Sequence, residues 1–346
     1  MTNFWKKLNK PFFVLAPMAD VTDCAFRQII AKYGSPDVFW TEFVSADGLS
    51  HPKAREKLLI DLKYGENEHP IVAQIFGANP DNIREASKLC LELGFDGIDI
   101  NMGCPDKSIE KQGAGACMIK NHELAREIIR AAKEGGGGLP VSVKTRIGYN
   151  KNEIETWIPE LLKEGISALT VHLRTRKEMS LVPAHWDVMK RVIEIRNELA
   201  PETLILGNGD VVDIEDGKSK CEEYGCDGVM LGRAIFGNPW LFSAKEHLSK
   251  SNLSGAAAPA NFSARPPAKD FSQDVPLLQE KLRVMVEHTK LFEKMLGGVK
   301  NFAIMKKHYK AYVNGFDGAK ELRMELMEAE NAEDVSNIVN TFLNKI

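Results

Sequence analysis

Long apolar runs are missing from this chain of 346 residues, although 44% of its residues are hydrophobic. No stretch approaches the roughly 18–20 consecutive apolar residues that a membrane-spanning helix needs. The first seven residues, MTNFWKK, also lack the apolar stretch and small-residue cleavage site of a secretory signal. The sequence therefore predicts a cytoplasmic protein, without membrane contact, that is large enough to bury a sizeable core.

Cysteine is scarce, and its spacing argues against the common metal sites. The six cysteines stand at positions 24, 90, 104, 117, 221 and 226, and no pair has the C-x2-C spacing of a zinc or iron–sulfur site. Without a secretory signal, a disulfide framework is not expected. We therefore predict reduced thiols and no metal site.

A strong excess of either charge is also lacking, since the formal net charge is −3. This argues against a uniformly basic nucleic-acid binder. Residues 281–320, however, contain nine Lys and Arg against three Asp and Glu. Such a segment is either a solvated helical face or an electrostatic footprint for a polyanion.

Short apolar segments alternate with amphipathic helical patterns up to about residue 240. The segments predicted to be strands are 13–16, 38–43, 71–76, 97–100, 141–144, 168–172, 204–207 and 228–231. The helical patterns between them lie near 22–33, 80–93, 121–134, 152–164, 186–199 and 213–224, and the crossover 43–70 is irregular. This alternation predicts a parallel (β/α)8 TIM barrel.

The composition changes after about residue 248. Residues 251–267 are rich in Gly, Pro, Ser and Ala and have no apolar period, which predicts a linker or long loop. Helical spacing then dominates at 276–296, 299–314, 317–328 and 332–344. We therefore expect a barrel domain at 1–248, a linker at 249–275 and a small all-helical domain at 276–346.

The most informative segment is IDINMGCPDK at residues 98–107, where an apolar strand delivers Cys104 to a Gly-Cys-Pro turn. In parallel α/β proteins this end of a strand is where ligands bind and chemistry occurs. A structural cysteine would instead lie inside the apolar run, although free cysteines are often buried and inert. Cys104 is therefore the candidate catalytic residue.

Other strand ends carry groups suited to a planar, phosphorylated ligand. Gln74 can pair with a heterocycle, Lys144 can stabilise negative charge on one, and His172 closes a neighbouring strand. Glycine-opened loops with Arg233 suit a phosphate. Each has a plainer interpretation, such as an ordinary turn, a surface lysine or a capped histidine, but together they favour FMN. The predicted cofactor-binding residues are Pro17, Met18, Ala19, Gln74, Lys144, His172, Asn208, Gly209, Asp210, Gly232 and Arg233.

The ordered set of motifs resembles the tRNA-dihydrouridine synthase family almost throughout the barrel. The motifs are APMADVTD at 16–23, NMGCP at 101–105, VKTR at 143–146, Thr175-Arg176 after His172, NGD at 208–210, GRA at 232–234 and GNPWLF at 237–242. The segments MKKHYKAY at 305–312 and GAKELR at 318–323 are similar to that family's helical tRNA-binding domain. Single motifs occur in several FMN barrels, whereas the ordered combination is specific.

This resemblance implies reduction of particular tRNA uridines to 5,6-dihydrouridine by FMN, which NADPH or NADH reduces first. Hydride would pass from flavin N5 to uracil C6, and Cys104 would protonate C5. Asn101 would contact the uracil edge and Arg176 a nearby phosphate, with turn capping and a surface charge as the plainer roles. Lys306 and Lys307 would bind the tRNA backbone, with Tyr309 and Tyr312 stacking on bases. No stable protein partner is implied.

The sequence departs from the family pattern in a few places, which concern loop geometry more than chemistry. Leu173 replaces a small residue after the strand-end histidine, and Asp20 stands where many relatives have glycine. The glycine run 135–138 and the segment 250–275 are also unusual. Two other functions stay open: an FMN barrel acting on a small pyrimidine or enoate, and an RNA-binding protein with a vestigial barrel. The basic segment 281–320 argues against the first, and the three rim residues Cys104, Lys144 and His172 argue against the second.

Overall fold

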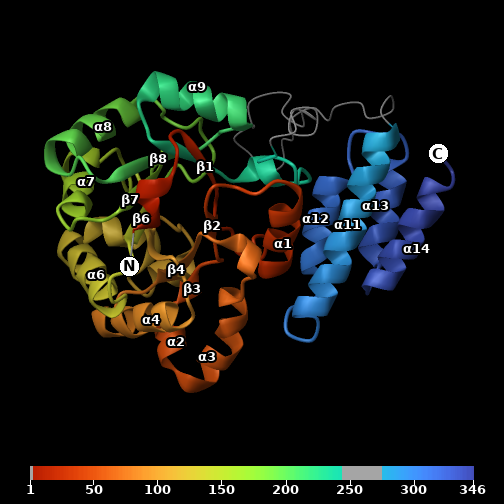
Figure 1. The fold of residues 1–346 in the computed structure, drawn as a ribbon, viewed down its shortest axis with the longest axis horizontal. Coiled ribbons are helices and arrows are strands. Elements are labelled where there is room, and N and C mark those ends of the chain that lie inside the picture. The colour runs from red at the N-terminus through yellow and green to blue at the C-terminus, as the bar shows by residue number, and fades with distance from the viewer. Residues whose placement is uncertain (1–2, 244–274) are drawn as a thin grey trace.

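The computed structural model describes residues 3–243 and 275–346, and its larger part is a parallel barrel (Figure 1). The sheet runs in the order β1-β9-β8-β7-β6-β5-β4-β2, and β3 pairs with β4. β1 pairs with β9, and a bridge between Val14 and Val38 joins β1 to the chain just before β2, so the ends of the sheet meet. The predicted TIM barrel is confirmed. Its strands are β1 (Phe12–Leu15), β2 (Phe39–Trp40), β3 (Val44–Ser45), β4 (Ile71–Phe76), β5 (Gly97–Met102), β6 (Val141–Arg146), β7 (Ala168–His172), β8 (Leu204–Asn208) and β9 (Gly228–Leu231).

The strands form because their apolar runs are buried on both faces. Every residue of β4 and β5 is buried, as expected for parallel strands enclosed by helices. Side chains such as Ile71, Ile75 and Ile100 belong to a continuous cluster that extends to the surrounding helices. This cluster holds the strand ends in place for the loops that follow them.

Helices surround the barrel, and several begin at side-chain caps. Asp23, Asn79, Asn121 and Asp213 each accept a backbone N–H from the first turn of the helix that follows. The helices of this part are α1 (Cys24–Tyr33), α2 (Ala46–Ser50), α3 (Pro52–Leu58), α4 (Pro80–Glu92), α5 (Lys107–Glu110), α6 (His122–Gly135), α7 (Ile154–Leu162), α8 (Val188–Leu199) and α9 (Ile214–Tyr224). The predicted helical patterns therefore correspond to α1, α4, α6, α7, α8 and α9.

One predicted strand differs from the structure. Residues 38–43 were expected to form a single strand, but β2 ends at Trp40 and β3 begins only at Val44. Between them Thr41 still donates its backbone N–H to the carbonyl of Val72 in β4, and the carboxylate of Glu42 pairs with Lys300. A buried carboxylate requires such a partner.

Four C-terminal helices pack together and onto the barrel through α1. They are α11 (Val275–Leu296), α12 (Ile304–Tyr312), α13 (Ala319–Glu328) and α14 (Ala332–Leu343). Their apolar core also includes Cys24, Ala25 and Ile29 of α1, which lies between the two parts of the molecule (Figure 1). In the described ranges no helix is long and apolar enough to cross a membrane. Residues 249–274 of the predicted linker lie outside these ranges.

Candidate active site at the barrel rim

The strands that carry the predicted residues end at one rim of the barrel. In the strand register, Asn101 of β5 is level with Lys144 of β6, and His172 of β7 is level with Arg146 and Asn208. The remaining predicted residues at this rim follow directly: Cys104 past β5, Gly209 and Asp210 past β8, and Gly232 and Arg233 past β9. The structure thus brings residues that are far apart in the sequence to one edge.

A single carboxamide shapes the turn that carries Cys104. Oδ1 of Asn101 accepts the backbone N–H groups of Gly103 at 3.1 Å and of Cys104 at 2.9 Å. Its Nδ2 donates to Oε1 of Gln74 at 3.1 Å, and Asn101 is only 6% exposed. The sequence left two roles open for Asn101, contact with the uracil edge and capping of the turn. The structure contains the hydrogen bonds of turn capping.

Gln74 belongs to a buried chain of hydrogen bonds. Its Nε2 donates to Oδ2 of Asp99 at 2.6 Å, and the Ser142 hydroxyl donates to Oδ1 of Asp99, also at 2.6 Å. Burial raises the pKa of Asp99 to about 6, although these two donors oppose the effect. Neither Asp99 nor Ser142 is among the predicted site residues. The sequence feature that could have identified Asp99 is a carboxyl group inside the otherwise apolar segment 97–100.

Burial also controls the protonation of Cys104 and Lys144. Burial raises the pKa of the Cys104 thiol, so the group is protonated at neutral pH. Burial, together with the nearby Arg146 guanidinium, lowers the pKa of Lys144 to about 8. Nζ of Lys144 donates to Oδ1 of Asn208 at 3.3 Å. At pH 7 the rim therefore presents a neutral thiol and an ammonium group.

His172 is neutral and surrounded by cations. Its pKa lies well below the ordinary value, first because it is buried and then because of four basic side chains, namely Arg146, Lys144, Arg174 and Arg233. Nη1 of Arg174 lies 3.2 Å from Nε2 of His172. Because a guanidinium only donates, Nε2 must be the acceptor and the proton resides on Nδ1. Positive charge concentrated at a partly buried rim suits an anionic ligand.

Two of these arginines share the carboxylate of Asp210. Arg174 donates to its Oδ2, which also accepts the backbone N–H of Ala184 at 2.8 Å, and Arg233 donates to its Oδ1 at 2.6 Å. Burial raises the pKa of Asp210, but the donors, led by Arg174, outweigh it and lower the pKa overall. Arg174 is not among the predicted site residues. Its position two residues after the strand-end His172 is the sequence feature that could have identified it.

The glycine before Asp210 is required by both conformation and space. Gly209 has a φ of 128°, and a Cβ atom there would lie 2.8 Å from the Cβ of Ala184. Its carbonyl accepts the indole N–H of Trp186 at 2.8 Å. The loop after β8 is therefore held in one shape, with its backbone close to the rim.

Arg176 lies against the Cys104 loop. Its guanidinium forms a two-pronged ion pair with Glu110 of α5 and donates to the carbonyl of Pro105 at 3.3 Å. Hydrogen bonds from Arg176 lower the pKa of Glu110 against the effect of burial. Arg176 was predicted to contact a substrate phosphate, and the structure adds a contact with the turn beside the thiol.

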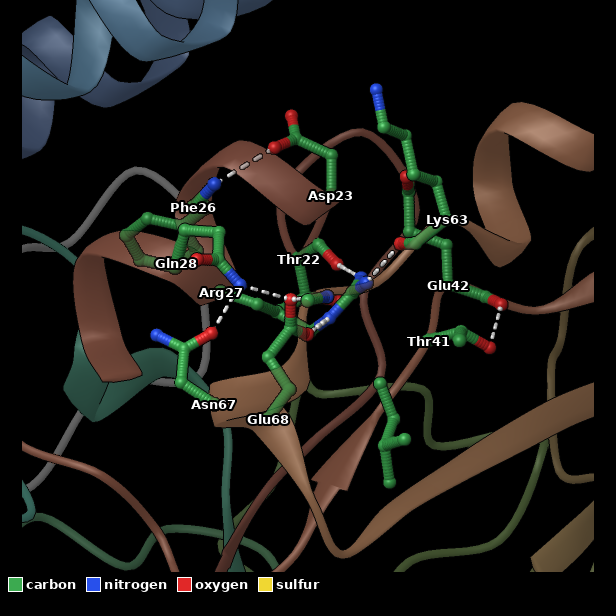
Figure 2. Close-up of polar contacts among 12 residues, drawn as sticks. Thr22, Asp23, Phe26, Arg27, Gln28, Thr41, Glu42, Lys63, Asn67 and Glu68 are labelled. Carbon is green, nitrogen blue, oxygen red and sulfur yellow. Dashed lines mark hydrogen bonds and ion pairs between the residues drawn. The ribbon is translucent and has the colours of Figure 1, made fainter. Parts of the chain in front are cut away.

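The loop that contains Pro17, Met18 and Ala19 is fixed at its far end. The backbone N–H of Met18 donates to Oγ1 of Thr22 at 2.9 Å. Figure 2 shows how the buried Arg27 then binds the carbonyl of Thr22 at 2.6 Å and the carboxylate of Glu68 at 2.5 Å. A fully buried guanidinium with these partners makes a rigid base for the loop.

The C-terminal helices differ in part from the expected tRNA-binding face. Tyr309 and Tyr312 have no exposed surface, so the prediction that they stack on RNA bases is wrong. Lys306 donates to the carbonyl of Met327 near the end of α13, and Lys307 lies 3.1 Å from Asp20. Contact of these two lysines with RNA stays a prediction.

The fold resembles that of a solved structure with low sequence identity. Morphinone reductase in complex with tetrahydroNAD aligns over 75% of this chain and 92% of its own, with a TM-score of 0.49 and 14% identity. Such values identify no function. The family of the chain must therefore be established from sequence comparison.

Sequence comparison gives extensive similarity. The family model for dihydrouridine synthase matches residues 14–346. A probable tRNA-dihydrouridine synthase 2 of Bacillus subtilis (strain 168) is 40% identical over 99% of this chain and 97% of its own length. A probable tRNA-dihydrouridine synthase of Staphylococcus aureus (strain Mu50 / ATCC 700699) is 40% identical over 98% of this chain and 95% of its own length. Because the match extends from the first barrel strand through the C-terminal helices, the chain belongs to the dihydrouridine synthase family.

Proposed function

We propose that this enzyme reduces uridines of tRNA to 5,6-dihydrouridine with FMN as its cofactor and NADPH or NADH as the reductant. The observation that carries the proposal is the position of Cys104, a protonated thiol held at the rim by Asn101. Family membership supplies the substrate class, since the curated relatives are named probable tRNA-dihydrouridine synthases. Division into an FMN-binding catalytic domain at 1–248 and a tRNA-binding domain at 276–346 is part of the proposal.

The residues present at the rim fit FMN. Lys144, two residues before the end of β6, offers an ammonium group that contacts Oδ1 of Asn208 at 3.3 Å, and it suits the negative edge of a reduced flavin. Arg233 and the backbone at Gly209 and Gly232 suit its phosphate, with Asp210 holding the arginine in place. When bound, FMN supplies the hydride that uracil C6 receives.

Cys104 completes the reduction by giving its Sγ proton to uracil C5. A donor must be protonated before the step, and burial secures this by raising the thiol pKa. Asn101 fixes the two peptide groups on either side of Gly103, so the thiol approaches from a set direction. Nδ2 of Asn101 carries a second hydrogen, which we assign to the uracil edge.

The uridine must leave the RNA stack to reach this rim, as for other enzymes that act on a base. Arg176 borders the entry, where Glu110 holds it beside the carbonyl of Pro105. A phosphate next to the flipped nucleotide would bind its guanidinium. Lys306 and Lys307 contribute on the helical side, where Lys307 is 53% exposed and its ion pair with Asp20 is open to exchange for a phosphate.

The test is nucleoside mass spectrometry of tRNA that lacks dihydrouridine, after incubation with the purified protein and NADPH. We expect a gain of two hydrogens on uridine that is lost in Cys104→Ala. Cys117→Ala is the matched control, because Cys117 is also a partly buried free thiol but lies outside the turn. Oxidation of NADPH with bound FMN but no dihydrouridine would indicate a flavoenzyme for small substrates and refute the proposal.

A further inference from the structure

Lys300 forms an ion bridge between the C-terminal helices and the barrel. It lies between α11 and α12, and its Nζ is 2.6 Å from Oε2 of Glu42 and 2.7 Å from Oδ1 of Asp61. Both carboxylates belong to the barrel part. The Lys300 side chain is 12% exposed and that of Glu42 is 6% exposed. The bridge is therefore shielded from solvent.

Burial distinguishes this contact from others across the same interface. The ion pair between Lys32 and Glu287 joins the same two parts, but its side chains are 56% and 38% exposed. Exposed pairs contribute little, whereas loss of one partner of a buried pair leaves an uncompensated charge. Removal of Lys300 should therefore disturb Glu42 strongly.

The second oxygen of Glu42 holds the loop beside the proposed flavin site. Oε1 accepts the backbone N–H of Asp20 at 2.6 Å. Asp20 has a φ of 53°, a left-handed conformation that a residue other than glycine adopts at a cost. It directly follows Pro17, Met18 and Ala19. Glu42 thus stabilises the strained end of this loop.

The other end of the loop has its own support. The backbone N–H of Met18 donates to Oγ1 of Thr22. Arg27 in turn binds the carbonyl of Thr22 (Figure 2). Those contacts lie wholly within the barrel part. Only the contact through Glu42 connects the loop to a buried cation of the helical part, as far as the described residues go.

We propose that Lys300 is a positioning residue, which acts through Glu42 to hold residues 17–20 in the shape that receives the cofactor. The helical domain thereby serves the flavin site directly, besides its role toward RNA. That FMN is the cofactor that contacts this loop rests on the proposed function. The ion bridge and its effect on Asp20 do not depend on that proposal.

The first experiment is amide hydrogen exchange of the full-length protein, measured without added FMN, on peptides that cover residues 16–22. In Lys300→Met we expect exchange at Asp20 to be about tenfold faster, because its acceptor is no longer fixed. Glu42→Gln should act alike, since it replaces one of the two acceptor oxygens by an NH2 donor and removes the negative charge that pairs with Lys300. Lys294→Met is the control, because Lys294 is exposed on α11, and Lys300→Arg should restore protection.

The second experiment is titration with FMN, followed by flavin fluorescence. Lys300→Met and Glu42→Gln should each weaken FMN binding about tenfold relative to Lys294→Met. Asp61→Asn, which keeps the contact between Lys300 and Glu42, should leave both readouts near the wild-type values. Equal effects of Asp61→Asn, or unchanged exchange at Asp20 in Lys300→Met, would overturn the proposal.

Amide exchange of the peptides that cover β4 and β5 distinguishes general destabilisation of the protein from loss of positioning at residues 16–22. Faster exchange there to the same extent as at 16–22 would mean that Lys300 is only structural. If the wild-type protein binds no FMN, the proposed function fails, while exchange at Asp20 still decides whether the bridge exists. The two failures are therefore distinguishable.

Discussion

Replacement of Asn101 by alanine should damage the Cys104 turn more than the fold as a whole. The change removes three hydrogen bonds, two from backbone N–H groups at 3.1 and 2.9 Å and one to Gln74 at 3.1 Å. Each net bond contributes about 1 kcal/mol, and buried donors left without an acceptor cost more. We therefore expect the free energy of unfolding to fall by about 2–4 kcal/mol.

The catalytic effect should exceed this loss of stability. A displacement of the thiol by about 1 Å can lower a rate about 100-fold, because proton transfer depends on position. We expect Asn101→Ala to form dihydrouridine about 100-fold more slowly under single-turnover conditions while it still binds FMN. Urea unfolding and nucleoside mass spectrometry provide the two measurements.

The matched control is Asn337→Ala on α14, where the asparagine is exposed. It should change stability by less than about 0.5 kcal/mol. Asn101→Asp keeps an acceptor for both N–H groups but loses the donor to Gln74, so it should retain more activity than alanine. Wild-type stability together with a wild-type rate in Asn101→Ala would refute the assignment of this side chain as the support of the turn.

Three further outcomes are expected. The raised pKa of Cys104 means that its proton is present below that pKa and lost above it, so loss of the donor should slow dihydrouridine formation only above the ordinary thiol value of about 8.5. Lys144, with a pKa of about 8, should add a decline near that pH that Lys144→Arg removes. A decline centred below about 8.5 that persists in the pH–rate profile of Lys144→Arg would contradict the donor role. Gly209→Ala should lower the free energy of unfolding by about 1–3 kcal/mol in urea and weaken FMN binding, because the φ of 128° and the close approach to Ala184 exclude a side chain. Unchanged stability and FMN affinity would contradict the need for glycine here. Arg176→Met should slow single turnover and increase proteolysis near α5 without loss of FMN, because Glu110 loses its partner. A wild-type cleavage pattern would argue against a role of Arg176 in the loop that carries Cys104.

The barrel and the position of Cys104 could be predicted because local sequence determines both. Apolar strands enclosed on two faces give continuous hydrophobic runs, and a Gly-Cys-Pro turn after such a run places a thiol beyond the strand. The predicted strand 38–43 was wrong in detail, since β2 ends at Trp40, and Glu42 just beyond it pairs with Lys300, more than 250 residues later in the chain. No local pattern contains that contact.

The network around Asn101 illustrates the same limit within the site. Its members Gln74, Asp99 and Ser142 lie on three different strands, and the pairing depends on strand register. Each residue alone was compatible with a ligand contact or a structural bond. Only the spacing across the sheet shows that both ends of the Gln74 carboxamide are engaged inside the barrel.

The buried tyrosines of α12 were predictable from information already in the sequence. Met305, His308, Tyr309 and Tyr312 follow the i, i+3, i+4, i+7 spacing of a core-facing helix stripe. All four are buried, and Tyr312 packs edge-on against the ring of His288. The interleaving of aromatic and basic residues predicts an RNA-binding pattern, but helical geometry separates them onto different faces.

The same separation changes what the basic segment 281–320 means. Three of its nine cations are not exposed, namely Lys281, Lys300 and Lys306. Lys300 joins the two parts of the molecule and Lys306 binds a carbonyl near the end of α13. The other six are exposed: Arg283, Lys290, Lys294, Lys307, Lys310 and Lys320. Since each neutralised phosphate contributes about 0.9 to the salt dependence of binding, these six set an upper limit of roughly five for that slope from this segment. The cations that bind within the protein and the exposed ones, to which the proposed RNA contact is confined, cannot be told apart from composition alone.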